Sequence, residues 1–365
     1  MAFTFDEADR AFRNDRINDL AQDPEGLRFL RLRSLYRASR PHYVEELIRV
    51  SGTAVRGIST SRDLRALHES GVKIQDIDRT IKKIHQEERK EREVYKPSLI
   101  TELYNVKVFD WGGLHQNSLE KTIVDNYVKK IRSYSELECK IENELQNSMR
   151  GYVLCSWYNH WTSIIIEDIF RNHKRIIPTV GQIAKIDFFI DNVPFDLKVT
   201  YLPEGFIKDK RRKIGLRPEL TELKRLARSL AVYFDQNTPE SKLLEDLWMR
   251  LRDHPKPAAD ALVDELKRIR MEILSEAEAR PEELIEWLYE NQGVRRFDAS
   301  NRLFLVLVDC GNFFESWKLK RAKELLESKI HNHLDQMGTS PGLRVSFMWE
   351  RTRHTVTSDV IFVRH

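Results

Sequence analysis

Two aspartates and a lysine lie in the segment KIDFFIDNVPFDLKVT, which runs from Lys185 to Thr200. Its Asp191-Asn192 pair tolerates positive φ angles and therefore predicts a two-residue hairpin turn between two strands. In that register Asp187 lies directly opposite Asp196, with Cβ atoms roughly 5 Å apart.

The predicted hairpin has an apolar face and a charged face, because side chains alternate along a strand. The apolar face receives Ile186, Phe188, Ile190, Val193, Phe195, Leu197 and Val199. The other face receives Asp187, Asp196 and Lys198. We therefore expect two carboxylates and one ammonium group on the same surface.

Two opposed carboxylates repel each other, so the pair requires a proton, a neighbouring base or a metal cation. Mg²⁺ suits such a pair, since it takes one or two carboxylates, keeps several waters and completes its octahedron with phosphate oxygens. Lys198 can direct its ammonium group at a water attacking a phosphate, or at the charge that develops on the phosphoryl group. The alternative interpretation is an amphipathic hairpin with a surface salt bridge, because an isolated Asp-x-Lys tripeptide is common.

Periodicity predicts a helix over 157–172 before this segment, with Glu167 in an otherwise apolar run where a carboxylate is unusual. Short β-type runs follow it. They are expected at 175–179, 185–190 and 193–201, with further strands at 303–308, 344–349 and 355–363 and a helix at 315–337. The order is helix with glutamate, strand, strand with aspartate, strand with Asp-x-Lys, and basic segment.

This order resembles the PD-(D/E)XK nuclease superfamily, and the chain as a whole is most similar to a type II restriction endonuclease. The resemblance implies an α/β (α+β) restriction-endonuclease-like fold, with a mixed β-sheet core flanked by helices. It implies Mg²⁺-dependent, sequence-specific hydrolysis of phosphodiester bonds in double-stranded DNA. The residues carried over are Asp187, Asp196 and Glu167 as catalytic metal ligands, the Leu197 carbonyl as a further ligand, and Lys198 as the catalytic lysine.

Two departures from the family pattern are visible. Ile186 stands where the family name has proline, and Thr200 is separated from Leu303 by a long segment that must be an insertion. We therefore expect a helical N-terminal region over 1–150, and a nuclease core over 151–365 with a helical insertion at about 216–295. Asp191 would replace Asp187 as a ligand if the hairpin were longer.

The charges are unevenly distributed along the chain. The total of 61 Lys and Arg against 57 Asp and Glu gives a net charge of +4. Five arginines and no acids give +5 over 27–40, nine bases against three acids give +6 over 205–230, and 8 bases against 15 acids give −7 over 235–290. The basic stretches predict DNA-contacting residues. They are Lys208, Lys210, Arg211, Arg212, Lys213, Arg28 and Arg31.

Other function classes lack support. The chain contains no P-loop, GxSxG, HExxH or GxGxxG motif in a suitable context. No apolar run approaches a membrane span, and the N-terminus has acids where a signal peptide would be basic, so we expect a cytoplasmic protein without a membrane partner. A two-fold homodimer would suit a palindromic DNA site. Two alternatives stay open: a non-catalytic DNA-binding or regulatory protein on the same fold, and a structure-specific repair or recombination nuclease.

Overall fold

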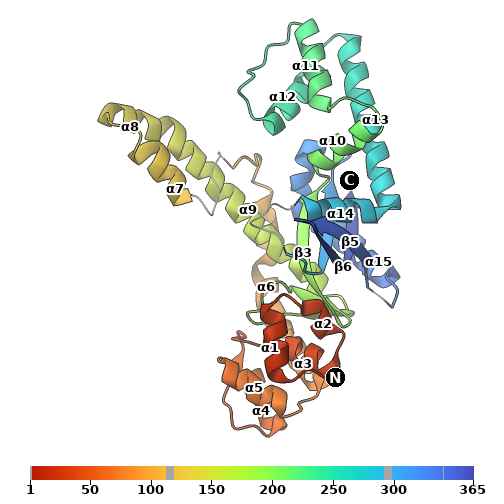
Figure 1. The fold of residues 1–365 in the computed structure, drawn as a ribbon. Helices are drawn as coiled ribbons and strands as arrows, with labels where there is room; N and C mark the ends of the chain where they lie inside the picture. The colour runs from red at the N-terminus through yellow and green to blue at the C-terminus, as the bar shows by residue number, and fades with distance from the viewer. Residues whose placement is uncertain (1, 112–118, 292–297, 340) are drawn as a thin grey trace.

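A mixed β-sheet forms the centre of the molecule, with helices on both faces (Figure 1). The computed structural model describes residues 2–111, 119–291, 298–339 and 341–365. A cluster of N-terminal helices lies at one end of the sheet, a helical arm projects from the side, and a set of inserted helices lies at the other end. The predicted mixed α/β class is confirmed.

The sheet is open and six-stranded, in the order β1-β2-β3-β4-β6-β5. The strands are β1 (Ile176–Pro178), β2 (Phe188–Ile190), β3 (Val193–Tyr201), β4 (Arg302–Val308), β5 (Leu343–Trp349) and β6 (Thr352–Arg364). Strand β3 pairs in parallel with β4 and β4 in parallel with β6, whereas the outer pairs are antiparallel. All six predicted strands are present, and β3 has the predicted bounds.

The two faces of the sheet bury separate apolar cores. Alternate residues of β4, such as Leu303 and Leu305, pack against α9 (Gln146–Arg171), α15 (Lys323–Gln336) and the 3₁₀ helix η5 (Phe313–Arg321). The intervening residues of β4 pack against α13 (Pro257–Ala279) and α14 (Pro281–Glu290). Every residue of β4 is buried, as expected for a central parallel strand.

The N-terminal cluster consists of six helices around one core. They are α1 (Phe5–Arg13), α2 (Ile17–Ala21), α3 (Pro24–Arg33), α4 (Pro41–Ser51), α5 (Ser61–Glu69) and the long α6 (Ile74–Leu103). Capping boxes begin α1 at Thr4 and α5 at Thr60. Ile186 and Phe189 of the hairpin pack into this core, so the N-terminal helices support the hairpin. Ile186 was predicted to share a face with Phe188, but it packs here because it precedes the paired part of β2.

Three predicted helices have other boundaries in the structure. The predicted helix over 315–337 is divided into the 3₁₀ helix η5 and α15. The apolar spacing of the basic stretch 27–40 predicts one helix ended by Pro41, but α3 ends at Arg33, and Pro41 is the first residue of α4, where its missing N–H costs nothing. The predicted helix 157–172 is the second half of α9, which begins at Gln146, so the expected domain boundary at 150 falls inside this helix.

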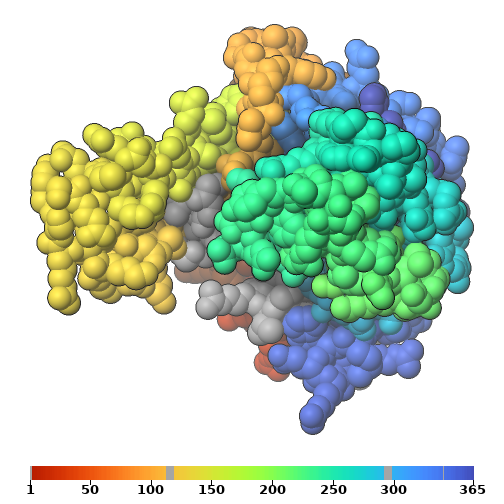
Figure 2. Space-filling view, turned by 90° about the horizontal axis from the view of Figure 1, so that it is seen from above, coloured from red at the N-terminus to blue at the C-terminus, as the bar shows by residue number. Residues whose placement is uncertain are grey.

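The arm, residues 119–154, projects away from the body (Figures 1 and 2). Its elements are α7 (Leu119–Ile123), the π-helical turn η2 (Val124–Val128), α8 (Tyr134–Lys140), the π-helical turn η3 (Ile141–Leu145) and the beginning of α9. The rest of α9 then runs into the body and packs on the sheet.

The insertion between β3 and β4 is helical, as predicted. It contains α10 (Glu204–Lys213), α11 (Glu219–Ser229), α12 (Glu240–Arg252), α13 and α14. It therefore begins directly after β3 and not at about 216 as predicted, because the basic segment that follows β3 is itself the helix α10. The guanidinium of Arg270 on α13 is buried and donates hydrogen bonds to the carboxylates of Glu204 and Glu219. One side chain thereby fastens α10 and α11 to α13.

Candidate active site

The predicted hairpin register is confirmed for residues 188–190 against 193–195, but the ladder does not include the predicted pair of Asp187 with Asp196. Ile190 pairs with Val193 and Phe188 with Phe195, and Asp191 occupies the turn with a φ angle of 53°. An aspartate tolerates this left-handed conformation better than most residues do.

Asp187 lies one residue before β2, where its backbone N–H still bonds the facing strand by donating to the Phe195 carbonyl at 2.9 Å. Its side chain bonds the same strand, since Oδ2 accepts a hydrogen bond from the backbone N–H of Leu197 at 2.7 Å. The structure gives Oδ1 of Asp187 no hydrogen-bond donor among the described residues. One oxygen thus fixes the carboxylate while the other stays available.

Asp196 lies within β3 and is 7% exposed. Lys198, two residues further along the same face, holds it in an ion pair at 2.7 Å, and 45% of the lysine side chain is exposed. Arg302, which pairs with Asp196 across the parallel strands, places its Nε 3.6 Å from Oδ2 of Asp196. Arg302 could not be predicted as part of this site, because no sequence pattern states which residue of a distant parallel strand pairs with Asp196.

The two aspartates share an environment that disfavours their charged forms. Burial raises the pKa of Asp187; the Leu197 N–H opposes this rise, whereas the charge of Glu167 adds to it. Burial also raises the pKa of Asp196; Lys198 opposes this rise, whereas the charge of Asp187 adds to it. Two buried carboxylates whose charged forms are disfavoured in this way favour a bound cation.

Glu167 lies on α9 and is ion-paired with Arg171 one turn later, at 2.8 Å. Its charge reaches Asp187, yet the described residues contain no group of three or more His, Cys, Asp or Glu side chains close enough together to bind a metal ion. The structure therefore brings together Asp187, Asp196 and Lys198, and it leaves Glu167 outside a shared ligand set. Two carboxylates are sufficient for Mg²⁺, which keeps several of its waters. The donor chemistry of the pair fits this ion.

No family model, curated protein or solved structure matches this chain. The function of the site is therefore inferred from its own geometry.

Three of the seven predicted DNA-contacting side chains lie in the interior. Arg31 is fully buried, forms an ion pair with Asp78 at 2.9 Å and stacks on the ring of Phe189 at 3.8 Å. Lys210 and Arg211 on α10 are also buried, and they pair with carboxylates of the insertion. These three cations hold the protein together, so the prediction of DNA contact has to be narrowed to the other four.

The other four basic residues differ in how free they are. Arg28 is half-buried and donates to Glu25 and to the His68 carbonyl. Lys208 is half-buried, whereas Arg212 and Lys213 at the end of α10 are exposed. Arg212 and Lys213 are therefore the predicted residues with the best access to a polyanion.

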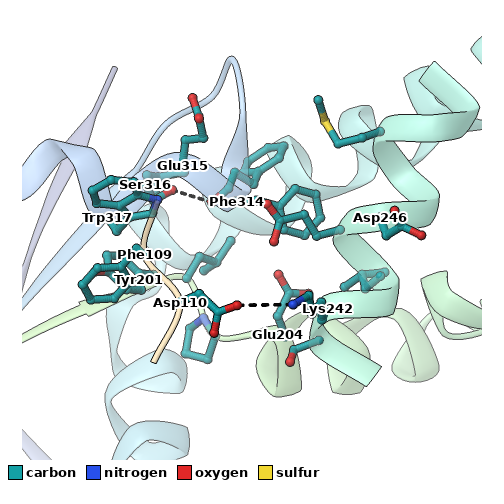
Figure 3. A pocket seen from close by; sticks show the side chains of 18 of the residues that line it. Phe109, Asp110, Tyr201, Glu204, Lys242, Asp246, Phe314, Glu315, Ser316 and Trp317 are labelled. Atoms are coloured by element: carbon teal, nitrogen blue, oxygen red, sulfur yellow. Dashed lines mark hydrogen bonds and ion pairs between the residues drawn. The ribbon is translucent and has the colours of Figure 1, made fainter. Parts of the chain in front are cut away.

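A cavity of about 910 Å³ lies at the carboxyl ends of β3 and β4 (Figure 3). It begins at Thr200, two residues beyond Lys198. Its wall carries five acidic residues against three basic ones: Asp110, Glu204, Glu245, Asp246 and Glu315 against Lys107, Lys242 and Arg270. An excess of acids disfavours phosphate, so this cavity is separate from the candidate site in its chemistry as well as in its place.

Within the described residues, no helix is both long enough and apolar enough to cross a membrane.

Proposed function

We propose that this chain is a Mg²⁺-dependent endonuclease that hydrolyses phosphodiester bonds of double-stranded DNA, in the manner of a type II restriction enzyme. The observation that carries this proposal is the hydrogen bond from the Leu197 N–H to the Asp187 carboxylate, because Leu197 stands between Asp196 and Lys198, which form an ion pair. The parallel strands β3 and β4 make this surface rigid, as a site for chemistry requires.

Each of the three side chains has a distinct role in the proposed reaction. Asp187 and Asp196 would hold the metal ion, together with the Leu197 carbonyl that the family resemblance suggests. Mg²⁺, when bound, lowers the pKa of a coordinated water and stabilises negative charge on the phosphoryl group. Lys198 would leave its ion pair with Asp196 and present its ammonium group to the attacking water or to the phosphate.

Arg302 would position Asp196 rather than touch the substrate. It approaches this carboxylate from β4 and is itself held by Asp298 at 2.9 Å. The surface beyond β3 continues into α10, whose last turn presents Arg212 and Lys213 to solvent. Those two cations are the proposed contacts to the DNA backbone, and their contribution would fall as salt increases.

Cleavage of plasmid DNA tests the proposal. We expect cutting with Mg²⁺ and none with EDTA, and at least ~100-fold slower cutting by Asp187→Ala and by Lys198→Ala. The matched control is Asp191→Asn, which removes the charge of the exposed aspartate of the same hairpin and keeps a residue that tolerates its positive φ angle. Intact cutting by both site variants would show that the site assignment is wrong.

The two alternative functions are outcomes of the same assay. Discrete fragments support a sequence-specific enzyme, whereas a smear, or cutting confined to branched or damaged DNA, supports a repair or recombination nuclease. DNA binding with no cutting at any Mg²⁺ concentration supports a regulatory protein. The ion pair between Lys198 and Asp196 is the observation that would favour this last outcome, because it already partly neutralises the site.

A further inference from the structure

The arm has no interior. From 119 to 154 no residue is buried, and Cys155 is the first buried residue of α9. The arm stands clear of the body in two perpendicular views (Figures 1 and 2). Short helices are marginal in water unless they pack an apolar face against something else.

Large apolar side chains are exposed along the arm. Val128 is 63% exposed, Tyr134 76% and Val153 55%. They come from η2, α8 and α9, so they are spread over three of the five elements of the arm. Exposed apolar groups gathered on one projecting element are typical of a protein interface.

The two halves of the arm carry opposite charges. The basic limb, residues 119–132, has four Lys or Arg against two acids, a net of +2. The acidic limb, residues 134–145, has one lysine against four glutamates, a net of −3. The ion pairs of the arm stay within a limb, Lys129 with Asp125 and Lys140 with Glu144, and none in the described part of the chain joins the two limbs. The opposite charges are therefore not used to hold the arm together.

We infer that the arm is a homodimer interface and that a second copy of this chain covers it. A two-fold axis between two arms places the basic limb of each copy against the acidic limb of the other, so both contacts are attractive. It also brings the exposed apolar side chains of both copies together. DNA fits this surface poorly, because the acidic limb would repel its phosphates.

The dimer would form whether or not the chain cleaves DNA, since Asp187, Asp196 and Lys198 lie outside the arm. Failure of one proposal is therefore distinguishable from failure of the other.

Charge reversal in the full-length chain tests the interface, with mass measured by sedimentation equilibrium. We expect the mass of two chains for the natural sequence. Lys129→Glu with Lys130→Glu makes both limbs acidic, and Glu136→Lys with Glu138→Lys makes both limbs basic. Each double variant should dissociate at least tenfold more readily. The control is Val50→Asp, at a valine of α4 that is 71% exposed, and it should leave the dimer unchanged.

Mixing the two double variants provides the decisive measurement. Their limbs attract each other again, so a heterodimer should form from two chains that are separately monomeric. This rescue would also show that both variants are folded. In a mixture of ¹⁴N- and ¹⁵N-labelled natural protein, a carbodiimide should join Lys129 or Lys130 of one copy to Glu136 or Glu138 of the other.

A natural chain that is monomeric at every concentration would overturn the inference. So would a dimer whose mass is unaffected by both double variants, or a mixture that fails to form the heterodimer. Variants that change DNA affinity while leaving the mass unchanged would assign the arm to DNA instead.

Discussion

The side-chain oxygen Oδ2 of Asp187 accepts a hydrogen bond from the backbone N–H of Leu197 at 2.7 Å. Leu197 stands between Asp196 and Lys198, so this bond ties the first aspartate to the middle of the Asp-x-Lys tripeptide. Asp187 lies just before the first residue of β2, outside the strand ladder, and this bond connects it to β3. The position of the pair is set by the backbone of β3 rather than by a mobile side chain.

Asp187→Asn should separate metal binding from folding. The amide oxygen can still accept from Leu197, while the repulsion with Asp196 disappears, so the metal-free variant should be more stable by up to about 1 kcal/mol. Mg²⁺ at a hundredfold excess over its Kd should stabilise the natural protein by about 2.7 kcal/mol and the variant far less. Thermal unfolding with Mg²⁺ and with EDTA measures both effects. Equal stabilisation of the two proteins by Mg²⁺ would place the ion elsewhere, and Asp191→Asn should behave like the natural protein.

The same pair should make stability depend on pH. Burial raises the pKa of Asp187 above its ordinary value of 3.8, so above that value the unfolded chain loses this proton before the folded chain does. The contribution of the group is therefore fully present below pH 3.8 and is lost as the pH rises through the raised pKa. In EDTA, the stability advantage of Asp187→Asn should grow as the pH rises across this window. A difference that shrinks with rising pH, measured by urea unfolding at several pH values, would contradict this expectation.

Arg212 and Lys213 should account for part of the salt dependence of DNA binding. Replacing both with alanine should weaken binding to all DNA sequences alike and reduce the slope of log K against log salt by roughly 1 for each phosphate that the protein no longer neutralises. Fluorescence anisotropy over a salt series measures the slope. Lys174→Ala is the control, an exposed lysine that precedes β1. An unchanged slope in the double variant would remove α10 from the DNA-binding surface.

Arg270→Met should destabilise the insertion severely. The guanidinium is 1% exposed and donates hydrogen bonds to Glu204 and Glu219. Its loss leaves both carboxylates unpaired, which should lower the free energy of unfolding by about 3–5 kcal/mol. Arg268→Met is the matched control two residues away on α13, where the arginine is exposed and the effect should stay within about 0.5 kcal/mol. Urea unfolding measures both. Similar losses of stability in the two variants would show that the buried ion pairs of Arg270 stabilise the fold no more than the exposed ion pair of Arg268 does.

The local parts of the fold were predictable, because short-range chemistry fixes them. The turn at Asp191-Asn192 set the register of 188–190 against 193–195. Asp187 lies outside these pairs, and its hydrogen bond with the Leu197 N–H holds it near Asp196. The end of α3 at Arg33 was not predictable from the same rules, since an unbroken periodic pattern continued toward Pro41.

Local sequence patterns also could not predict which basic side chains are buried and which are exposed. Arg31 lies buried because Asp78 and the turn at Asp191 receive it, and both are far from it in the chain. Lys210 is neutralised by Glu276 and Glu283 in the same way. A count of charge along the sequence cannot separate such cations from Arg212, because burial depends on partners that the fold supplies.

The parallel pairing of β3 with β4 determines when the site can be completed. The two strands are neighbours in the sheet, yet the chain from 202 to 301 runs between them. Closing so long a loop is entropically costly and slows folding unless the loop has already become compact. The helices of the insertion provide that compactness, and Arg302 can reach Asp196 only after they have been synthesised. During translation the hairpin with its two aspartates therefore lacks its neighbouring strand β4 while more than a quarter of the chain is being synthesised.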